Sequence, residues 1–166
     1  MTATDNDLTR TDLLGTALVE AVQRTGASVG GLYLRPDDEP VLRLAVLCGL
    51  PPELFAPWTR VALAAPLPVS DAVRDDRLVW VGSQEDLVRL YPRTAVALPY
   101  RFALAAVPLH GRFRCWGSLL LMWPSSHPAR LTDRQRGAIM AGGRRVARQL
   151  DESLAWPGAE PAAHGA

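Results

Sequence analysis

The 166-residue chain contains no lysine: its 18 basic residues are all arginine. This absence excludes a catalytic lysine, a lysine Schiff base and a phosphate-binding loop that ends in Gly-Lys-Ser/Thr. Two cysteines, Cys48 and Cys115, are too few for a disulfide framework or a four-cysteine zinc site. The formal net charge of +1 leaves no overall field that would attract nucleic acid or an anionic membrane.

Long apolar runs are also missing. No uninterrupted apolar stretch approaches the roughly 20 residues of a membrane-spanning helix, and the polar, acidic N-terminus does not resemble a signal peptide. Hydrophobic residues make up 48% of the chain, which is enough for one domain with a substantial core. We expect a cytoplasmic protein, and basic residues limited to arginine together with abundant Ala, Pro and Gly favour an actinobacterial source.

Apolar spacing predicts a helix at each end of a single domain. Between residues 14 and 22 the apolar residues recur on one helical face, and Gly26 is placed to end that helix in a left-handed turn. Thr132 and Gln135 form a capping box that opens a second helix, expected to run to about Leu154. The expected divisions are a flexible N-terminus over 1–9, the domain over 10–154 and a disordered tail over 155–166.

Between these helices the pattern predicts a sheet. Regular alternation would place Leu42, Leu44, Val46 and Cys48 on one face of their strand. Gly111 lies in a tight connection, where we expect positive φ. The predicted strands lie within residues 27–36, 41–48, 59–64, 78–81, 102–109 and 114–123.

Short helices are expected over 51–58, 70–77 and 83–91, with Ser70 and Ser83 as caps of the last two. Pro92 is expected to stop the third of them. The whole order favours an α+β domain with a central antiparallel sheet of five to six strands. The terminal helices would pack on one face, and short helices and loops would cover the other.

Residues 107–123 read VPLHGRFRCWGSLLLMW and resemble a GAF domain. GAF domains typically show an apolar strand ending in V-P-L, a turn containing glycine, and G-x-L-x-L entering the last strand, here residues 107–109, Gly111 and 117–121. D-R-Q at 133–135 is similar to the start of the last GAF helix. Residues 66–92 resemble GAF domains found beside PAS domains and metal-dependent serine phosphatases in actinobacteria, so the resemblance covers roughly residues 10–154.

This resemblance implies a non-catalytic signalling module that binds a small molecule or a protein partner. GAF domains also pair through their terminal helices, so we expect a homodimer, a signalling partner acting in trans or a fragment of a longer protein, and no cofactor. A ligandless dimerisation scaffold is one alternative. Another is a GAF-fold thiol redox enzyme using Cys48 and Cys115, although the methionine sulfoxide reductase of this fold carries cysteines in its middle loops, and residues 51–100 contain none.

GAF ligands bind between the sheet and the short middle helices, where this chain gathers aromatic residues. With a nearby arginine they would make an apolar pocket with one charged handle, and the competing interpretation is simple core filling. The candidate ligand-binding residues are Trp58, Arg77, Trp80, Tyr91, Tyr100, Arg101 and Phe102.

Two other features have ordinary explanations. His110 would be the haem ligand of some GAF sensors, but no second ligand accompanies it, and we expect an exposed turn residue. The arginine-rich last helix also carries Asp133, Asp151 and Glu152, which favours a solvated or subunit-facing surface over a phosphate-binding one. We therefore expect no catalytic residue, no metal, no nucleic acid and no membrane partner.

Overall fold

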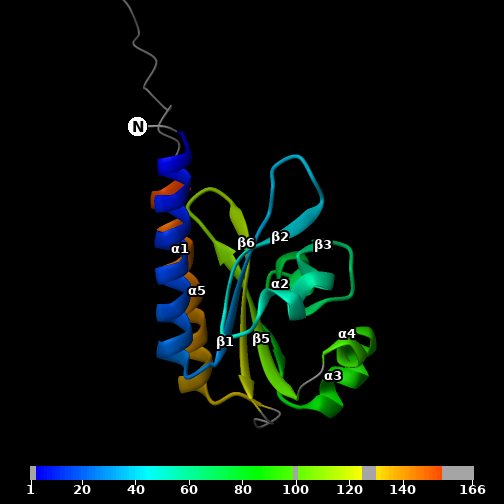
Figure 1. Cartoon of the computed structure of the whole chain (residues 1–166). Coiled ribbons are helices and arrows are strands. Elements are labelled where there is room, and N and C mark those ends of the chain that lie inside the picture. Colours follow the sequence, from blue (N-terminus) through cyan, green and yellow to red (C-terminus); the bar gives the residue numbers. More distant parts are fainter. Residues whose placement is uncertain (1–2, 99–100, 125–129, 155–166) are drawn as a thin grey trace, which may run out of the picture.

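A computed structural model describes residues 3–98, 101–124 and 130–154 and shows one sheet between two layers of helices (Figure 1). The six strands lie in the order β3-β2-β1-β6-β5-β4, and every neighbouring pair is antiparallel. The predicted α+β class is therefore confirmed. The strands are β1 (Val29–Leu34), β2 (Val41–Cys48), β3 (Arg60–Ala62), β4 (Val79–Val81), β5 (Phe102–His110) and β6 (Cys115–Pro124).

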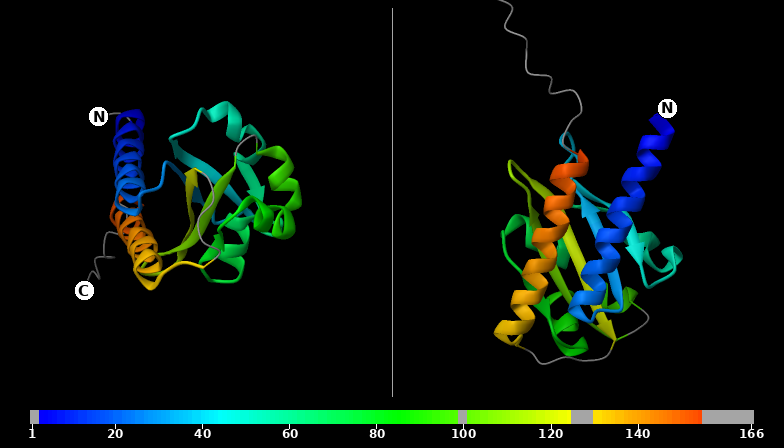
Figure 2. Two further views of the ribbon diagram at one scale, coloured as in Figure 1. Left: turned by 90° about the horizontal axis from the view of Figure 1, so that it is seen from below. Right: turned by 90° about the vertical axis from the view of Figure 1, so that its left-hand side faces the viewer.

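Two long helices, α1 (Ala3–Thr25) and α5 (Asp133–Leu154), run antiparallel to each other over one face of the sheet (Figures 1 and 2). The start of α1 and the end of α5 lie at the same end of the molecule. The helix α1 begins within residues 1–9, which we expected to precede the domain, and the predicted tail over 155–166 lies outside the described residues. Within the described part of the chain, no helix is long and apolar enough to cross a membrane.

The other face of the sheet is covered by shorter elements, as predicted (Figure 1). They are the 3₁₀ helix η1 (Pro52–Trp58) and the helices α2 (Pro68–Arg74), α3 (Gln84–Leu90) and α4 (Pro92–Ala97). Ser83 caps α3 as expected, because its hydroxyl accepts a hydrogen bond from the Asp86 N–H at 3.1 Å. The prediction that Ser70 caps α2 is wrong: Pro68 starts that helix, and the buried Ser70 hydroxyl donates to the Ala62 carbonyl at 2.8 Å.

The ends of α1 and α5 follow the predicted signals. Gly26 ends α1 with φ of +71°, in the left-handed region. At the start of α5 the Thr132 N–H donates to Gln135 Oε1 at 3.0 Å, and the Gln135 N–H donates to Thr132 Oγ1 at 3.1 Å. This reciprocal pair is the predicted capping box.

The core lies in two layers, one on each face of the sheet, because strand side chains alternate. In β6, Leu119 and Leu121 pack against α1 and α5, whereas Leu120 and Met122 pack against the short-helix layer. Gly30 lets α1 approach the sheet closely: a Cβ there would lie 2.5 Å from Val22 Cγ2. The strands of the sheet therefore contact both layers directly.

A β-bulge interrupts the alternation of β2. Its pairing with β1 skips Ala45, which is left as an extra residue. Leu42 and Leu44 therefore pack on the short-helix layer, while Val46 and Cys48 pack on the side of α1 and α5. The prediction that these four side chains share one face is wrong, because the extra residue reverses the direction of those that follow.

The hairpin that joins β5 to β6 is fastened to the end of α5. Asp151 accepts hydrogen bonds from Trp116 Nε1 at 2.8 Å and from the Arg112 N–H at 2.9 Å. Gly111 does not have the positive φ that we expected; instead, a Cβ there would collide with Trp116 Nε1 and Asp151 Oδ1. Positive φ occurs at Gly117, +146°, where a Cβ would collide with the Tyr33 carbonyl oxygen of the neighbouring strand.

Candidate functional site

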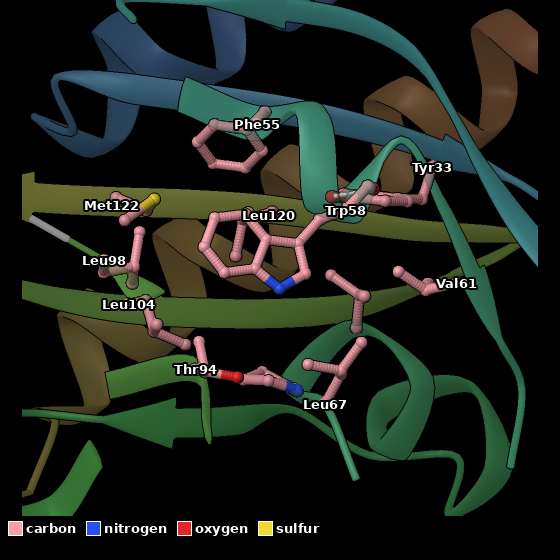
Figure 3. A pocket seen from close by; sticks show the side chains of 12 residues that line it. Tyr33, Phe55, Trp58, Val61, Leu67, Thr94, Leu98, Leu104, Leu120 and Met122 are labelled. Atoms are coloured by element: carbon pink, nitrogen blue, oxygen red, sulfur yellow. Dashed lines mark hydrogen bonds between the residues drawn. The ribbon is translucent and has the colours of Figure 1, made fainter. Parts of the chain in front are cut away.

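An apolar cavity of about 40 Å³ lies between the sheet and the short-helix layer (Figure 3). Its floor is formed by β1, β5 and β6, and its walls come from η1, β3, α2 and α4. Most of the lining residues are buried, but Trp58, Leu67 and Leu98 are only half-buried. The lining residues are Tyr33, Phe55, Trp58, Val61, Leu67, Pro68, Val69, Thr94, Leu98, Leu104, Leu120 and Met122.

Prolines position the walls of the cavity. Pro68 occupies the first turn of α2, and Pro92 occupies the first turn of α4, where the missing N–H costs no helical hydrogen bond. We predicted Pro92 only as the stop of the preceding helix, and α4 was not predicted. The helix α4 brings Thr94 into the cavity wall (Figure 3).

Two hydroxyl groups and the indole N–H of Trp58 belong to this mostly apolar lining. The Tyr33 hydroxyl donates a hydrogen bond to the Trp58 carbonyl at 3.0 Å, which joins the floor to η1. Burial raises the pKa of Tyr33 well above its usual value, so this group stays a neutral donor. The Thr94 hydroxyl is buried and has no hydrogen-bond partner among the described residues.

Of the seven candidate residues from the sequence, the structure places Trp58 in the lining of the cavity. Tyr91 and Phe102 belong to the same buried layer but do not line it. The Tyr91 hydroxyl donates to Asp71 Oδ2 at 2.7 Å, and burial together with this carboxylate raises the pKa of Tyr91. Tyr100 lies outside the described residues.

Trp80 lies on the opposite face of the sheet. It packs on the layer of α1 and α5, where its ring meets that of Trp123 edge to face with centroids 5.5 Å apart. The two rings line a separate hollow of about 310 Å³ beside Ile139. The alternation of side chains in β4 explains this position of Trp80. Val79 and Val81 point to the short-helix layer, so Trp80, which lies between them, points the other way.

The expected charged handle is also absent from the cavity lining. Arg77 is exposed, and its guanidinium pairs with Asp75 at 3.5 Å. Arg101 is exposed just before β5. Neither arginine lines the cavity, and none of its lining residues carries a charge.

His110 is exposed at the end of β5, as predicted, and its Nε2 contacts Asp76 Oδ1. His110 is far from the cavity: Leu104, on the cavity floor, is six residues before it in β5, which corresponds to roughly 20 Å along the strand. No group of three or more His, Cys, Asp or Glu side chains suited to a metal ion occurs in the described part of the chain.

The two cysteines are free and far apart. Cys48 and Leu121 both pair with Gly30, one from each side of β1, and Leu121 is six residues beyond Cys115 in β6. This register separates the cysteines by roughly 20 Å along the strands, too far for a disulfide. Burial raises the pKa of the Cys48 thiol, which disfavours the reactive thiolate. Neither cysteine lines the cavity.

No protein-family model and no curated protein matches this sequence. Solved structures match it over most of its length. The GAF domain/HD domain protein from Geobacter sulfurreducens has a TM-score of 0.70 at 14% identity, covering 89% of this chain and 95% of that chain. The GAF-B domain of DevS from Mycobacterium smegmatis has a TM-score of 0.65 at 16% identity, covering 88% and 96%, respectively.

An enzyme shows the same likeness. The type II free methionine-R-sulfoxide reductase from Thermoplasma acidophilum has a TM-score of 0.68 at 14% identity, covering 89% of this chain and 96% of that chain. Identities this low establish a common fold and leave the activity open. The chain therefore has the GAF-like α+β fold that the sequence predicted, and most of these neighbours are GAF domains.

Proposed function

We propose that the chain is a non-catalytic GAF signalling module, which binds a small molecule in the cavity and passes the binding event to α1 and α5. The observation that carries this proposal is the position of the cavity on the sheet. Leu120 and Met122 line the cavity, while Leu119 and Leu121, their neighbours in β6, pack against the two long helices. A ligand that shifts this strand would therefore move the surface against which both helices pack.

The long helices are the proposed output surface. Leu13 and Val19 of α1 expose 45% and 42% of their surface, although both are large apolar side chains. Such residues favour a homodimer through the terminal helices or a signalling partner bound in trans. The resemblance of residues 66–92 supports an actinobacterial partner that carries a PAS or a metal-dependent serine phosphatase domain.

The two alternatives make different use of the same fold. A ligandless dimerisation scaffold would keep the helices and leave the cavity without a role. A thiol redox enzyme would need a reactive sulfur at a substrate site, and the positions of Cys48 and Cys115 outside the cavity lining speak against it. A buried unpaired hydroxyl in the wall of a cavity favours the sensor over the scaffold, because it offers a ligand a partner.

A native mass spectrum of the protein purified from its source organism tests the proposal. We expect a dimer mass with a reproducible small additional mass. Trp58→Ala should release that mass, and Trp80→Ala, which removes the same ring from the opposite face, should retain it. A bare dimer in the unmodified protein would favour the scaffold.

A further inference from the structure

We propose that the ligand of this cavity is a neutral, largely apolar small molecule with a single hydrogen-bonding oxygen, which binds the Thr94 hydroxyl. This inference rests on the proposed function, because it names the ligand class of the same site. It follows from the absence of charge in the lining, the unpartnered hydroxyl and the small volume.

The lining excludes a charged ligand. None of the residues around the cavity is ionisable at neutral pH, since the Tyr33 phenol is held neutral by burial. A carboxylate or phosphate in this space would lose its hydration without gaining a counter-charge. The two arginines that we considered as handles, Arg77 and Arg101, do not line the cavity.

The Thr94 hydroxyl and the Trp58 indole N–H are the polar side-chain groups that the lining leaves for a ligand, and of the two the Thr94 hydroxyl is the buried one. Thr94 is only 8% exposed, and its Oγ1 has no partner among the described residues. The cavity surface itself is almost entirely apolar, so a ligand oxygen pairs with this hydroxyl once the Thr94 side chain rotates about its Cα–Cβ bond. The Tyr33 hydroxyl differs, because its proton is already donated to the Trp58 carbonyl. A buried hydroxyl without a partner costs free energy, and a ligand oxygen that pairs with it recovers that cost.

The size of the cavity limits the ligand to a few heavy atoms in this conformation. One water needs about 10–15 Å³ of such space, and the cavity offers about 40 Å³. The half-buried Trp58 stands over the space in Figure 3, so outward rotation of its ring would admit a somewhat larger molecule. Small cyclic or branched ketones, alcohols and esters fit this description.

Three probes of similar size test the inference: cyclopentanone, cyclopentane and cyclopropanecarboxylate. Binding is followed by ¹³C-methyl NMR of methionine, because Met122 lines the cavity, while Met140 lies in α5 on the opposite face and reports whether binding reaches that helix. We expect cyclopentanone to shift the Met122 signal with a lower dissociation constant than cyclopentane does. The carboxylate should leave the Met122 signal unchanged. The Met140 signal in α5 should shift less, and only with the probes that shift Met122.

The variant Thr94→Val removes the hydroxyl and keeps the shape. It should weaken cyclopentanone binding by about 3- to 10-fold, the share of one neutral hydrogen bond, and leave cyclopentane unaffected. Thr94→Ser, which keeps the hydroxyl, should bind the ketone within about 2-fold of the unmodified protein. Thr94→Val should also fold at least as stably, because it removes an unpaired buried group.

Each other outcome has a definite meaning. Equal ketone binding by the unmodified protein and Thr94→Val, or tight binding of the carboxylate, would overturn the inference and leave the sensor function standing. If no probe shifts Met122 in any variant, the cavity is not a ligand site, and the proposed function fails together with the inference.

Discussion

Two adjacent glycines of α5 allow a quantitative test of how closely this helix is packed. Gly142 and Gly143 are both buried in the same helix, so replacement by alanine gives the same gain in helix propensity, about 1 kcal/mol. Their surroundings differ. A Cβ at position 142 would lie 3.8 Å from the Ala21 Cβ of α1, an ordinary contact, whereas one at position 143 would lie 2.9 Å from Val107 Cγ1 of β5.

Gly142→Ala should therefore stabilise the protein by about 0.5–1 kcal/mol. Gly143→Ala gains the same propensity but overpacks a buried valine, which costs about 1–3 kcal/mol. We expect the two variants to differ by about 1–3 kcal/mol in the free energy of unfolding. In a chain of this length each kcal/mol moves Tm by about 2–4 °C.

Urea unfolding followed by tryptophan fluorescence measures both variants. A double-mutant cycle with Val107→Ala supplies the control, because this substitution removes the Val107 Cγ1 atom that the new Cβ at position 143 would overlap. There, Gly143→Ala should become stabilising. The reasoning is refuted if Gly143→Ala stabilises the unmodified background as much as Gly142→Ala does, since α5 would then not be held against β5 at this point.

Two further predictions concern the hairpin and the buried thiol. Asp151→Ala should destabilise the fold by about 1–2 kcal/mol, because Trp116 Nε1 and the Arg112 N–H lose their charged acceptor at a half-buried position; an unchanged urea midpoint would contradict this. In a Cys115→Ser background, alkylation of Cys48 should reach its half-maximal rate at a higher pH in the folded than in the unfolded protein. Burial raises the folded pKa of Cys48, so the neutral thiol stabilises the fold at low pH and this contribution is lost as pH rises; coinciding profiles would refute it.

The architecture was predictable because local patterns and packing agree. The helical face that begins at residue 14, the capping box at Thr132 and the long apolar runs of β5 and β6 each specify an element, and amphipathic elements of this order have few ways to bury their apolar sides. The bulge at Ala45 was not predictable, because an alternating sequence accepts an extra residue without a visible signal.

The site was harder to predict, since proximity along the chain does not decide the face of a sheet. Trp58 and Trp80 lie on either side of the same short helix, α2, in the chain, but the register of β4 sends Trp80 to the opposite layer. Thr94 was missed because Pro92 was interpreted only as a helix stop. The preference of proline for the first helical turn is the signal that would have revealed α4 and placed Thr94 on it.

The two consecutive glycines of β1 let both layers approach the backbone of one strand. At Gly30, the side chains of α1 rest on bare backbone, and a Cβ at Gly31, on the other face, would lie 3.6 Å from Tyr33 Cε2 and from the Leu120 Cβ of the cavity floor. A single peptide plane thus stands between helix and cavity wall. At this point, a displacement of the β1 backbone acts directly on α1 at one face and on the cavity floor at the other.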